Sequence, residues 1–107
     1  MLIYKILRAD EWAALERDGQ TEGAPVDLAD GYIHFSTADQ LPGTLSKHFA
    51  GEENLMLLAV DAQLAESDLR WEPARGALFP HLYRALYRAD VIWARPMPSA
   101  DELAALA

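Results

Sequence analysis

One apolar run, Leu55-Met56-Leu57-Leu58-Ala59-Val60, is bounded by Asn54 and Asp61. A short apolar run without polar alternation is typical of a strand that is covered on both faces. Hydrophobic residues make up 51% of the 107 residues, which is enough for one core. We therefore expect a central strand over residues 55–60 and a single domain over residues 1–107.

The other predicted elements surround this strand. Apolar alternation and turn signals predict further strands over residues 2–7, 32–36, 69–72, 80–83 and 91–95, with a turn over 73–76. Asp10 is placed to cap a helix that Gly19 ends, and Ser99 to cap a last helix through residue 106. Residues 20–31 are rich in Gly, Pro and Asp and are expected to be mostly loop.

A further helix is predicted after the second strand. Thr37 and Gln40 have the spacing of a capping box, with Thr37 as the N-cap and its hydroxyl bonded to the backbone N–H near Gln40. Pro42 is tolerated in the first turn, and Gly51 is the expected end. Strands outnumber helices and their order is mixed. This predicts an α+β fold with a small mixed, largely antiparallel sheet and short helices, not a doubly wound one.

Charge and composition limit the classes of partner and the cellular location that we expect. The formal net charge is -8, from 17 acidic and 9 basic residues, so a polyanion such as DNA or RNA should be repelled and no nucleic-acid partner is expected. The sequence contains no apolar run near the ~20 residues that a membrane span needs. It also contains no cysteine and no signal-peptide pattern at its start, so we expect a cytoplasmic protein.

The first candidate site is the segment 30–37. By strand alternation Tyr32, His34 and Ser36 share one face. We expect His34 and Ser36 to face a cavity, and Ile33 and Phe35 to face the core. Ser36 and Thr37 then stand at a helix N-terminus, where an anionic group such as a phosphate is favoured. The alternative is structural: Thr37 only caps the helix, and His34 satisfies a buried carbonyl.

The second candidate site is the segment 79–83. His81 and Tyr83 share a face by alternation and form either a ligand clamp or a core pair. Arg75 and Arg84 flank the segment and can hold a carboxylate or phosphate by bidentate hydrogen bonds, unless they are simply solvated.

Glu72 precedes the second segment, between Trp71 and Pro73. An apolar setting would raise the pKa of its carboxyl and suit it to acid–base chemistry. Alternatively, it is an exposed edge-strand residue.

These residues predict one cluster rather than two sites. Two half-buried histidines in a small fold are most easily satisfied by sharing one wet cleft, because an unpaired buried polar group is unfavourable. We expect a His34–Glu72–His81 cluster with Tyr83 at its edge and imidazoles within roughly 12 Å, the reach of one ligand with its hydrogen bonds. His48 is expected at a rim, and the histidine spacing does not support a metal site, so no metal is expected.

Several stretches recur together in one known group: residues 3–6, 30–40, Asp61, 71–72 and 79–83. The chain resembles a family of small bacterial proteins called domain of unknown function nine-five-two. That resemblance implies a fold similar to ADP-ribosyltransferases, with a split mixed sheet around an NAD cleft.

It also implies roles for single residues. His34 would bond a ribose hydroxyl, Glu72 would steady an oxocarbenium-like ribosyl centre, and Tyr83 would stack on a nicotinamide-like ring. Ser36-Thr37 resembles the start of the Ser-Thr-Ser strand of those enzymes, with Ala38 as the departure. The paired Glu-x-Glu of many transferases is absent.

Two functions follow. In the first, a polar cleft lined by His34, Ser36, Glu72, His81 and Tyr83 binds a nucleotide-like or phosphorylated small molecule, with NAD as the possible cofactor, and acts on it. In the second, the chain is a non-catalytic binding or interaction domain whose histidine segments are structural. An enzyme should gather His34, Glu72 and His81 in one cleft, whereas an interaction domain should scatter them.

Overall fold

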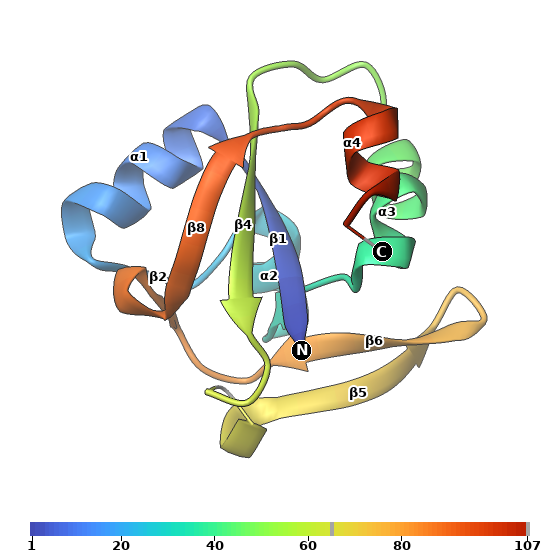
Figure 1. The fold of residues 1–107 in the computed structure, drawn as a ribbon. Helices are drawn as coiled ribbons and strands as arrows, with labels where there is room; N and C mark the ends of the chain where they lie inside the picture. Colours follow the sequence, from blue (N-terminus) through green and yellow to red (C-terminus); the bar gives the residue numbers. More distant parts are fainter. Residues whose placement is uncertain (65, 107) are drawn as a thin grey trace.

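Strand β4 (Leu55–Asp61) is the centre of a three-stranded antiparallel sheet, between β1 (Leu2–Arg8) and β8 (Val91–Pro96) (Figure 1). The computed structural model describes residues 1–64 and 66–106. Leu57 and Leu58 are both fully buried, but they belong to hydrophobic clusters on opposite faces of the sheet. The strand is therefore central and covered on both faces, as the apolar run predicted.

Helices cover this sheet from two sides. Helix α1 (Ala9–Asp18) packs on one face, and α3 (Leu41–His48) and α4 (Ala100–Ala104) lie on the other (Figure 1). The N-cap of α1 is Arg8 rather than Asp10, whose carboxylate instead lies in the first turn. Gly19 ends α1 with φ 78°, a left-handed conformation that glycine adopts readily.

A second antiparallel sheet has the order β3–β6–β5 and lies below the first in Figure 1. Its strands are β3 (Ile33–His34), β6 (Ala77–Leu82) and β5 (Leu69–Ala74). The turn between β5 and β6 is shorter than predicted, because Pro73 pairs with Leu78 inside the ladder. Pro73 is tolerated there because β5 is an edge strand.

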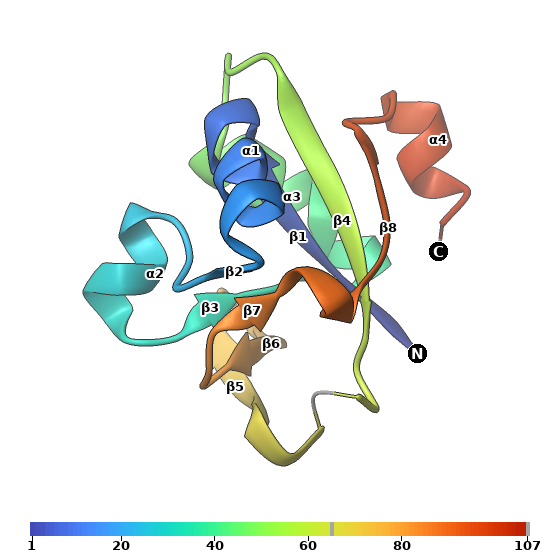
Figure 2. The same cartoon turned by 90° about the vertical axis from the view of Figure 1, so that its left-hand side faces the viewer.

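The prediction of loop over residues 20–31 was wrong. Short strand β2 (Gln20–Thr21) pairs with β7 (Leu86–Tyr87), and helix α2 (Pro25–Asp30) follows. Pro25 stands at the start of α2 and Gly31 at its end, the asymmetry that short helices often have. Figure 2 shows α2 beside β3, on the side of the molecule away from α4.

The predicted capping box is half formed. Thr37 is the N-cap of a 3-10 turn, η1 (Ala38–Gln40), that leads into α3, and its backbone N–H donates to Gln40 Oε1 at 3.0 Å. Its hydroxyl donates to Asp39 Oδ1 at 2.6 Å instead of accepting from the backbone, so that part of the prediction was wrong. Helix α3 ends at His48, earlier than Gly51.

The two sheets meet where the chain leaves β3. The Phe35 N–H donates to the Pro80 carbonyl of β6, and Ser36 then exchanges two backbone hydrogen bonds with Tyr4 of β1. Two further 3-10 turns, η2 (Glu66–Asp68) and η3 (Arg88–Asp90), connect the remaining strands. The α+β class with antiparallel sheets and short helices is confirmed. In the part of the chain that the structure describes, no helix is long and apolar enough to cross a membrane.

The two-sided burial of β4 can be tested by truncation. We expect Leu57→Ala and Leu58→Ala each to lower the free energy of unfolding by about 3 kcal/mol, because each leaves a cavity in a separate cluster. Leu78→Ala is the matched control, because Leu78 is 55% exposed. Urea unfolding measures all three, and a small effect at either buried leucine would contradict the two-cluster description.

Candidate functional site

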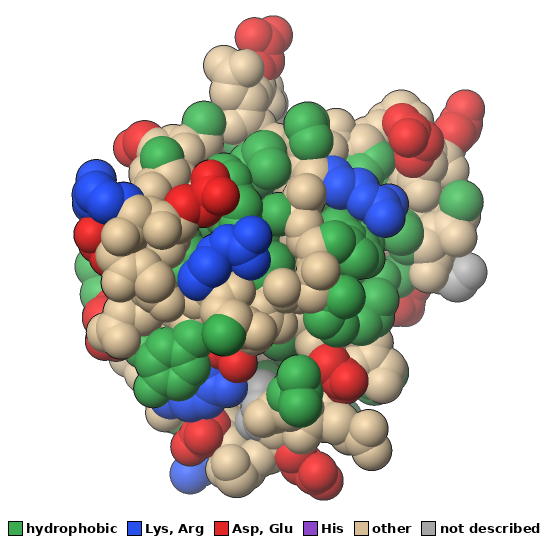
Figure 3. Space-filling model, turned by 60° about the vertical axis from the view of Figure 1, so that its left-hand side comes forward, with side chains coloured by type: hydrophobic (Ala, Val, Ile, Leu, Met, Phe, Trp, Pro, Cys, Tyr) green, Lys and Arg blue, Asp and Glu red, His purple; other side chains and the backbone are tan. Residues whose placement is uncertain are grey.

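A cavity of about 710 Å³ lies between the two sheets. Its walls come from β1, α2, α3 and the β5–β6 hairpin. All three histidines of the chain line it, together with the aromatic rings of Tyr4, Tyr32, Phe35, Phe49 and Phe79. On the face drawn in Figure 3, which carries α1, no histidine is visible among the described side chains.

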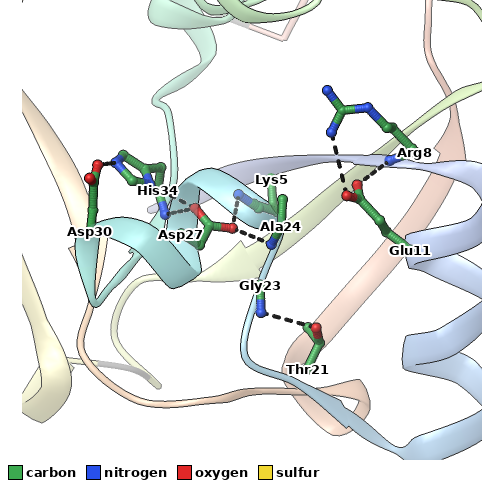
Figure 4. Close-up of polar contacts among 9 residues, drawn as sticks. All are labelled: Lys5, Arg8, Glu11, Thr21, Gly23, Ala24, Asp27, Asp30 and His34. Carbon is green, nitrogen blue, oxygen red and sulfur yellow. Dashed lines mark hydrogen bonds and ion pairs between the residues drawn. The ribbon is translucent and has the colours of Figure 1, made fainter.

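The carboxylate of Asp27, on α2, is buried beside this cavity and accepts several hydrogen bonds. It accepts hydrogen bonds from Lys5 Nζ at 2.8 Å, the Ala24 N–H at 2.7 Å and the His34 N–H at 3.0 Å (Figure 4). His34 Nδ1 lies 2.6 Å from the same carboxylate. The side chain of Asp27 is fully buried and that of Lys5 is 6% exposed, so this is a true interior ion pair.

The environment fixes the charge of Asp27. Burial by itself would raise the pKa of this carboxyl, but the hydrogen bonds from His34 and the charge and hydrogen bond of Lys5 lower the pKa to about 2. Burial lowers the pKa of Lys5, and the Asp27 carboxylate opposes that shift. Asp27 is therefore ionised at neutral pH and orients the His34 ring.

His34 lies as the strand alternation predicted. Its side chain is 29% exposed and His34 lines the cavity, while Ile33 and Phe35 belong to the hydrophobic core, with Phe35 also bordering the cavity. Its Nε2 lies 2.9 Å from Asp30 Oδ2, so both ring nitrogens contact carboxylates. His34 is thus neither fully buried nor bonded to backbone alone.

The second histidine forms its own pair. His81 Nδ1 lies 2.9 Å from Glu72 Oε1, and the Tyr83 hydroxyl donates to the same oxygen at 2.5 Å. The rings of His34 and His81 are 5.3 Å apart, within the separation predicted for one site. The structure therefore brings together His34, Glu72, His81 and Tyr83.

The raised pKa that the acid–base interpretation of Glu72 required is not found. Hydrogen bonds from Tyr83 and His81 lower the pKa of this carboxyl, and burial opposes them only weakly. Glu72 is a half-buried acceptor that orients its two partners rather than a protonated acid. The same contact raises the pKa of Tyr83.

Tyr32 is the centre of an aromatic group that joins the two histidines. Its ring stacks on His81 with centroids 4.2 Å apart and also lies 4.7 Å from His34 and 5.1 Å from Tyr83. Stacking of this kind fixes ring orientation in addition to burying apolar area. Tyr32 therefore belongs to the site.

The predicted ligand-binding residues divide. Ser36 is buried at the cavity wall, and its hydroxyl lies 2.8 Å from Thr44 Oγ1. Arg75 also lines the cavity. Thr37 and Tyr83 do not line the cavity, and neither does Glu72, although the cleft was predicted to be lined by Glu72 and Tyr83. Arg84 pairs with Asp90 at 2.8 Å and lies outside the wall as well.

Cationic residues are frequent in the cavity wall, although two of them are paired, Lys5 with Asp27 and Arg8 with Glu11 and Glu52. Four of the nine Lys and Arg residues line it, namely Lys5, Arg8, Lys47 and Arg75, against three of the 17 acidic residues, Asp10, Glu11 and Asp30. His48 stands at the exposed rim, as expected, and its pKa is lowered by partial burial and then by the charges of Arg75 and Lys47. Among the described residues no group of three or more His, Asp or Glu is arranged to hold a metal ion.

Sequence reasoning missed Asp27, Lys5 and Thr44, and it placed Tyr32 on the face of His34 without giving it a role in the site. Asp27 lies in the segment predicted as loop, where Asp is an ordinary turn residue. Lys5 stands inside a strand pattern, and the one available signal was its place on a strand that is otherwise buried. A lysine at such a position requires a buried acceptor.

Fold and cavity together define a small α+β protein in which two antiparallel sheets enclose a histidine-lined pocket. The chain belongs to the family described as "Protein of unknown function (DUF952)", which matches residues 6–94. The family resemblance is thereby confirmed, whereas the likeness to ADP-ribosyltransferases stays a prediction.

Two solved structures of protein CC0527 from Caulobacter crescentus are similar to this chain. The X-ray crystal structure has 46% sequence identity and a TM-score of 0.90, and the match covers 97% of this chain and 99% of that one. The solution NMR structure has 49% identity and a TM-score of 0.81, covering 94% and 88%. No curated protein matches the chain.

The Asp27 contacts generate a stability prediction. We expect Asp27→Asn to lower the free energy of unfolding at pH 7 by about 3–5 kcal/mol, because Lys5 would be left as a buried charge without its counter-ion. The double variant Lys5→Met, Asp27→Asn should recover part of this loss. Asp30→Asn is the exposed control, and urea unfolding compares the variants.

The lowered pKa of Asp27 also determines how the stability of the fold depends on pH in acid. Because the folded pKa of Asp27 lies below its unfolded value, its contribution of roughly 2 kcal/mol is present above about pH 4 and is lost as the pH falls through about 2. Wild-type unfolding free energies measured between pH 5 and pH 2 should show this loss, and Asp30→Asn should retain it. An unchanged stability down to pH 2 would contradict the assignment.

Proposed function

We propose that the chain binds a small anionic molecule of the nucleotide-like or phosphorylated type in the histidine-lined cavity, and that His81 exchanges a proton with it. One observation carries the proposal: in a chain with a net charge of -8, Lys47 and Arg75 line one pocket together with all three histidines, and neither cation has a carboxylate within 4 Å among the described residues. Two cations without a carboxylate partner repel each other, and an anion bound between them removes that repulsion. Lys47 and Arg75 therefore favour an anionic ligand.

The size of the cavity supports a metabolite rather than a macromolecule. Its 710 Å³ lies within the roughly 300–1,000 Å³ of small-molecule sites, which combine apolar walls with a few placed polar groups. Tyr32 and Phe79 supply flat apolar surface, and the lysine and arginine side chains supply charge. NAD and ADP-ribose are among the first ligands to test, because the family resemblance implies them.

The geometry of His81 supports acid–base chemistry. The Glu72 carboxylate can only accept, so Nδ1 of His81 carries a proton and Nε2 is the acceptor in the neutral ring. Nε2 has no protein partner among the described residues, and His81 lines the cavity, which makes Nε2 the ring atom available to a ligand. A histidine oriented by a carboxylate, with its other nitrogen directed at a ligand, is the arrangement of a general base.

Binding can be tested by thermal shift with NAD, ADP-ribose, ribose 5-phosphate and inorganic phosphate. A ligand at about 100 times its Kd adds roughly 2.7 kcal/mol of stability and so raises the Tm by roughly 10 °C. Lys47→Gln should reduce the shift, whereas Arg95→Gln, which removes the same charge outside the cavity wall, should leave it unchanged. No shift with any anion would contradict the proposal and favour a structural role for the histidines.

The proton-transfer part has a separate test. For any ligand that the wild type converts, detected by mass spectrometry, we expect His81→Gln to slow conversion by about 10²–10⁴-fold while changing the Kd little. Arg95→Gln is again the control. Conversion that is unaffected in His81→Gln would contradict the role of His81 but would leave the binding proposal standing.

A further inference from the structure

Arg75 has a backbone conformation that arginine rarely adopts. It stands in the two-residue turn between β5 and β6, with φ 47°, and Gly76 follows with φ 78°. Two consecutive positive φ values define a type I′ hairpin turn, in which Asn or Gly is favoured at the first position. An arginine with its β-carbon is strained there, so the turn itself gives no reason for this residue.

The side chain of Arg75 is held over the cavity. Its Nη2 donates to Thr44 Oγ1 at 3.1 Å, and the guanidinium lies 4.3 Å from the ring centre of Phe79. The Thr44 hydroxyl itself donates to the Gln40 carbonyl at 3.2 Å. With its proton used in this way, it is a fixed acceptor that positions one edge of the guanidinium.

Most of the hydrogen-bonding capacity of Arg75 remains unused. A guanidinium has five N–H donors, and the contact to Thr44 uses one of its nitrogens. Within the described ranges 1–64 and 66–106, no carboxylate oxygen lies within 4 Å of Arg75 or Lys47. The remaining N–H groups can therefore meet an anion bidentately, as guanidinium groups commonly do with phosphate and carboxylate.

The spacing along β6 relates this anion to the chemistry of His81. Phe79, on which Arg75 stacks, and His81 are two residues apart, so their side chains project from the same face of the strand. Two strand residues span about 7 Å. One molecule of the size of a phosphorylated sugar can therefore reach both groups, whereas inorganic phosphate cannot.

We infer that Arg75, positioned by Thr44 and Phe79, is the specificity-determining residue of the cavity and binds the phosphate or carboxylate end of a ligand whose other end reaches His81. This inference rests on the proposed function. It explains why a strained arginine occupies the turn: the position aims the guanidinium from the tip of the hairpin back over Thr44 of α3. An exposed arginine with only a structural role would gain nothing from that conformation.

The test separates stability from affinity in one variant, Arg75→Asn. Because Asn suits the first position of a type I′ turn, the variant should be more stable than the wild type, with a Tm higher by a few degrees. Because it removes the charged donor, it should weaken binding of ribose 5-phosphate by about 10- to 100-fold in calorimetry. A substitution that merely disturbed the fold would lower both the Tm and the affinity for ribose 5-phosphate.

Three probes identify the anion. Ribose 5-phosphate, glucuronate and neutral ribose are compared on the wild type, on Arg75→Asn and on the control Arg95→Gln. The wild type and control should prefer one anionic probe over ribose by at least about tenfold, and Arg75→Asn should lose most of that preference.

Each contrary outcome has its own meaning. If the wild type binds ribose 5-phosphate and Arg75→Asn binds it equally well, this inference is overturned while the proposed function stands. If the wild type binds none of these probes and none of the ligands tested above, both fall. An Arg75→Asn variant with an unchanged or lower Tm would overturn the argument that the arginine is kept against the preference of the turn.

Discussion

The buried carboxylate of Asp27 is the contact on which the arrangement of the cavity depends. It receives N–H donors from β1, from the start of α2 and from β3, three elements that share no backbone ladder with one another at these positions. A buried carboxylate is tolerated only when its oxygens are fully paired, so these elements must keep their relative positions. Gly23 reflects the same constraint, because a β-carbon there would lie 2.5 Å from the Asp27 side chain.

The charges of the chain are organised in two different ways. Most of the cations described in contacts are neutralised in pairs, both outside the cavity, as in Arg84 with Asp90, and in its wall, as in Lys5 with Asp27 and Arg8 with Glu52. In the cavity wall, Lys47 and Arg75 are close enough to His48 for their charges to lower its pKa, although partial burial is the larger cause of that shift. Lys47 and Arg75 therefore leave a local excess of positive charge on a chain whose net charge is -8. The distribution of charge, rather than its total, therefore carries the functional information.

Local periodicity made part of this structure predictable. The period of two along a strand placed His34 and Ser36 on the cavity side and Ile33 in the core, and the apolar run identified β4 as central. What could not be predicted were contacts made by the tertiary fold. Lys5 and Asp27 are 22 residues apart, and the local sequence around either residue does not indicate that it pairs with the other. The raised pKa that the acid–base interpretation of Glu72 required is not found, because its partners, Tyr83 and His81, contribute more than its apolar neighbours.

The β5–β6 hairpin is held together much more firmly than it is held to its neighbour. Six residue pairs join β5 to β6, whereas two join β6 to β3. Arg75 lies at the tip of this hairpin and His81 near its base, and the ladder between β5 and β6 fixes the distance between them along β6. Hydrogen bonds from Gln40 to the Leu78 carbonyl and from Arg75 to Thr44 join the hairpin to the η1–α3 segment. The length of a molecule that can contact both residues is therefore set within a single hairpin and does not depend on how closely the two sheets pack.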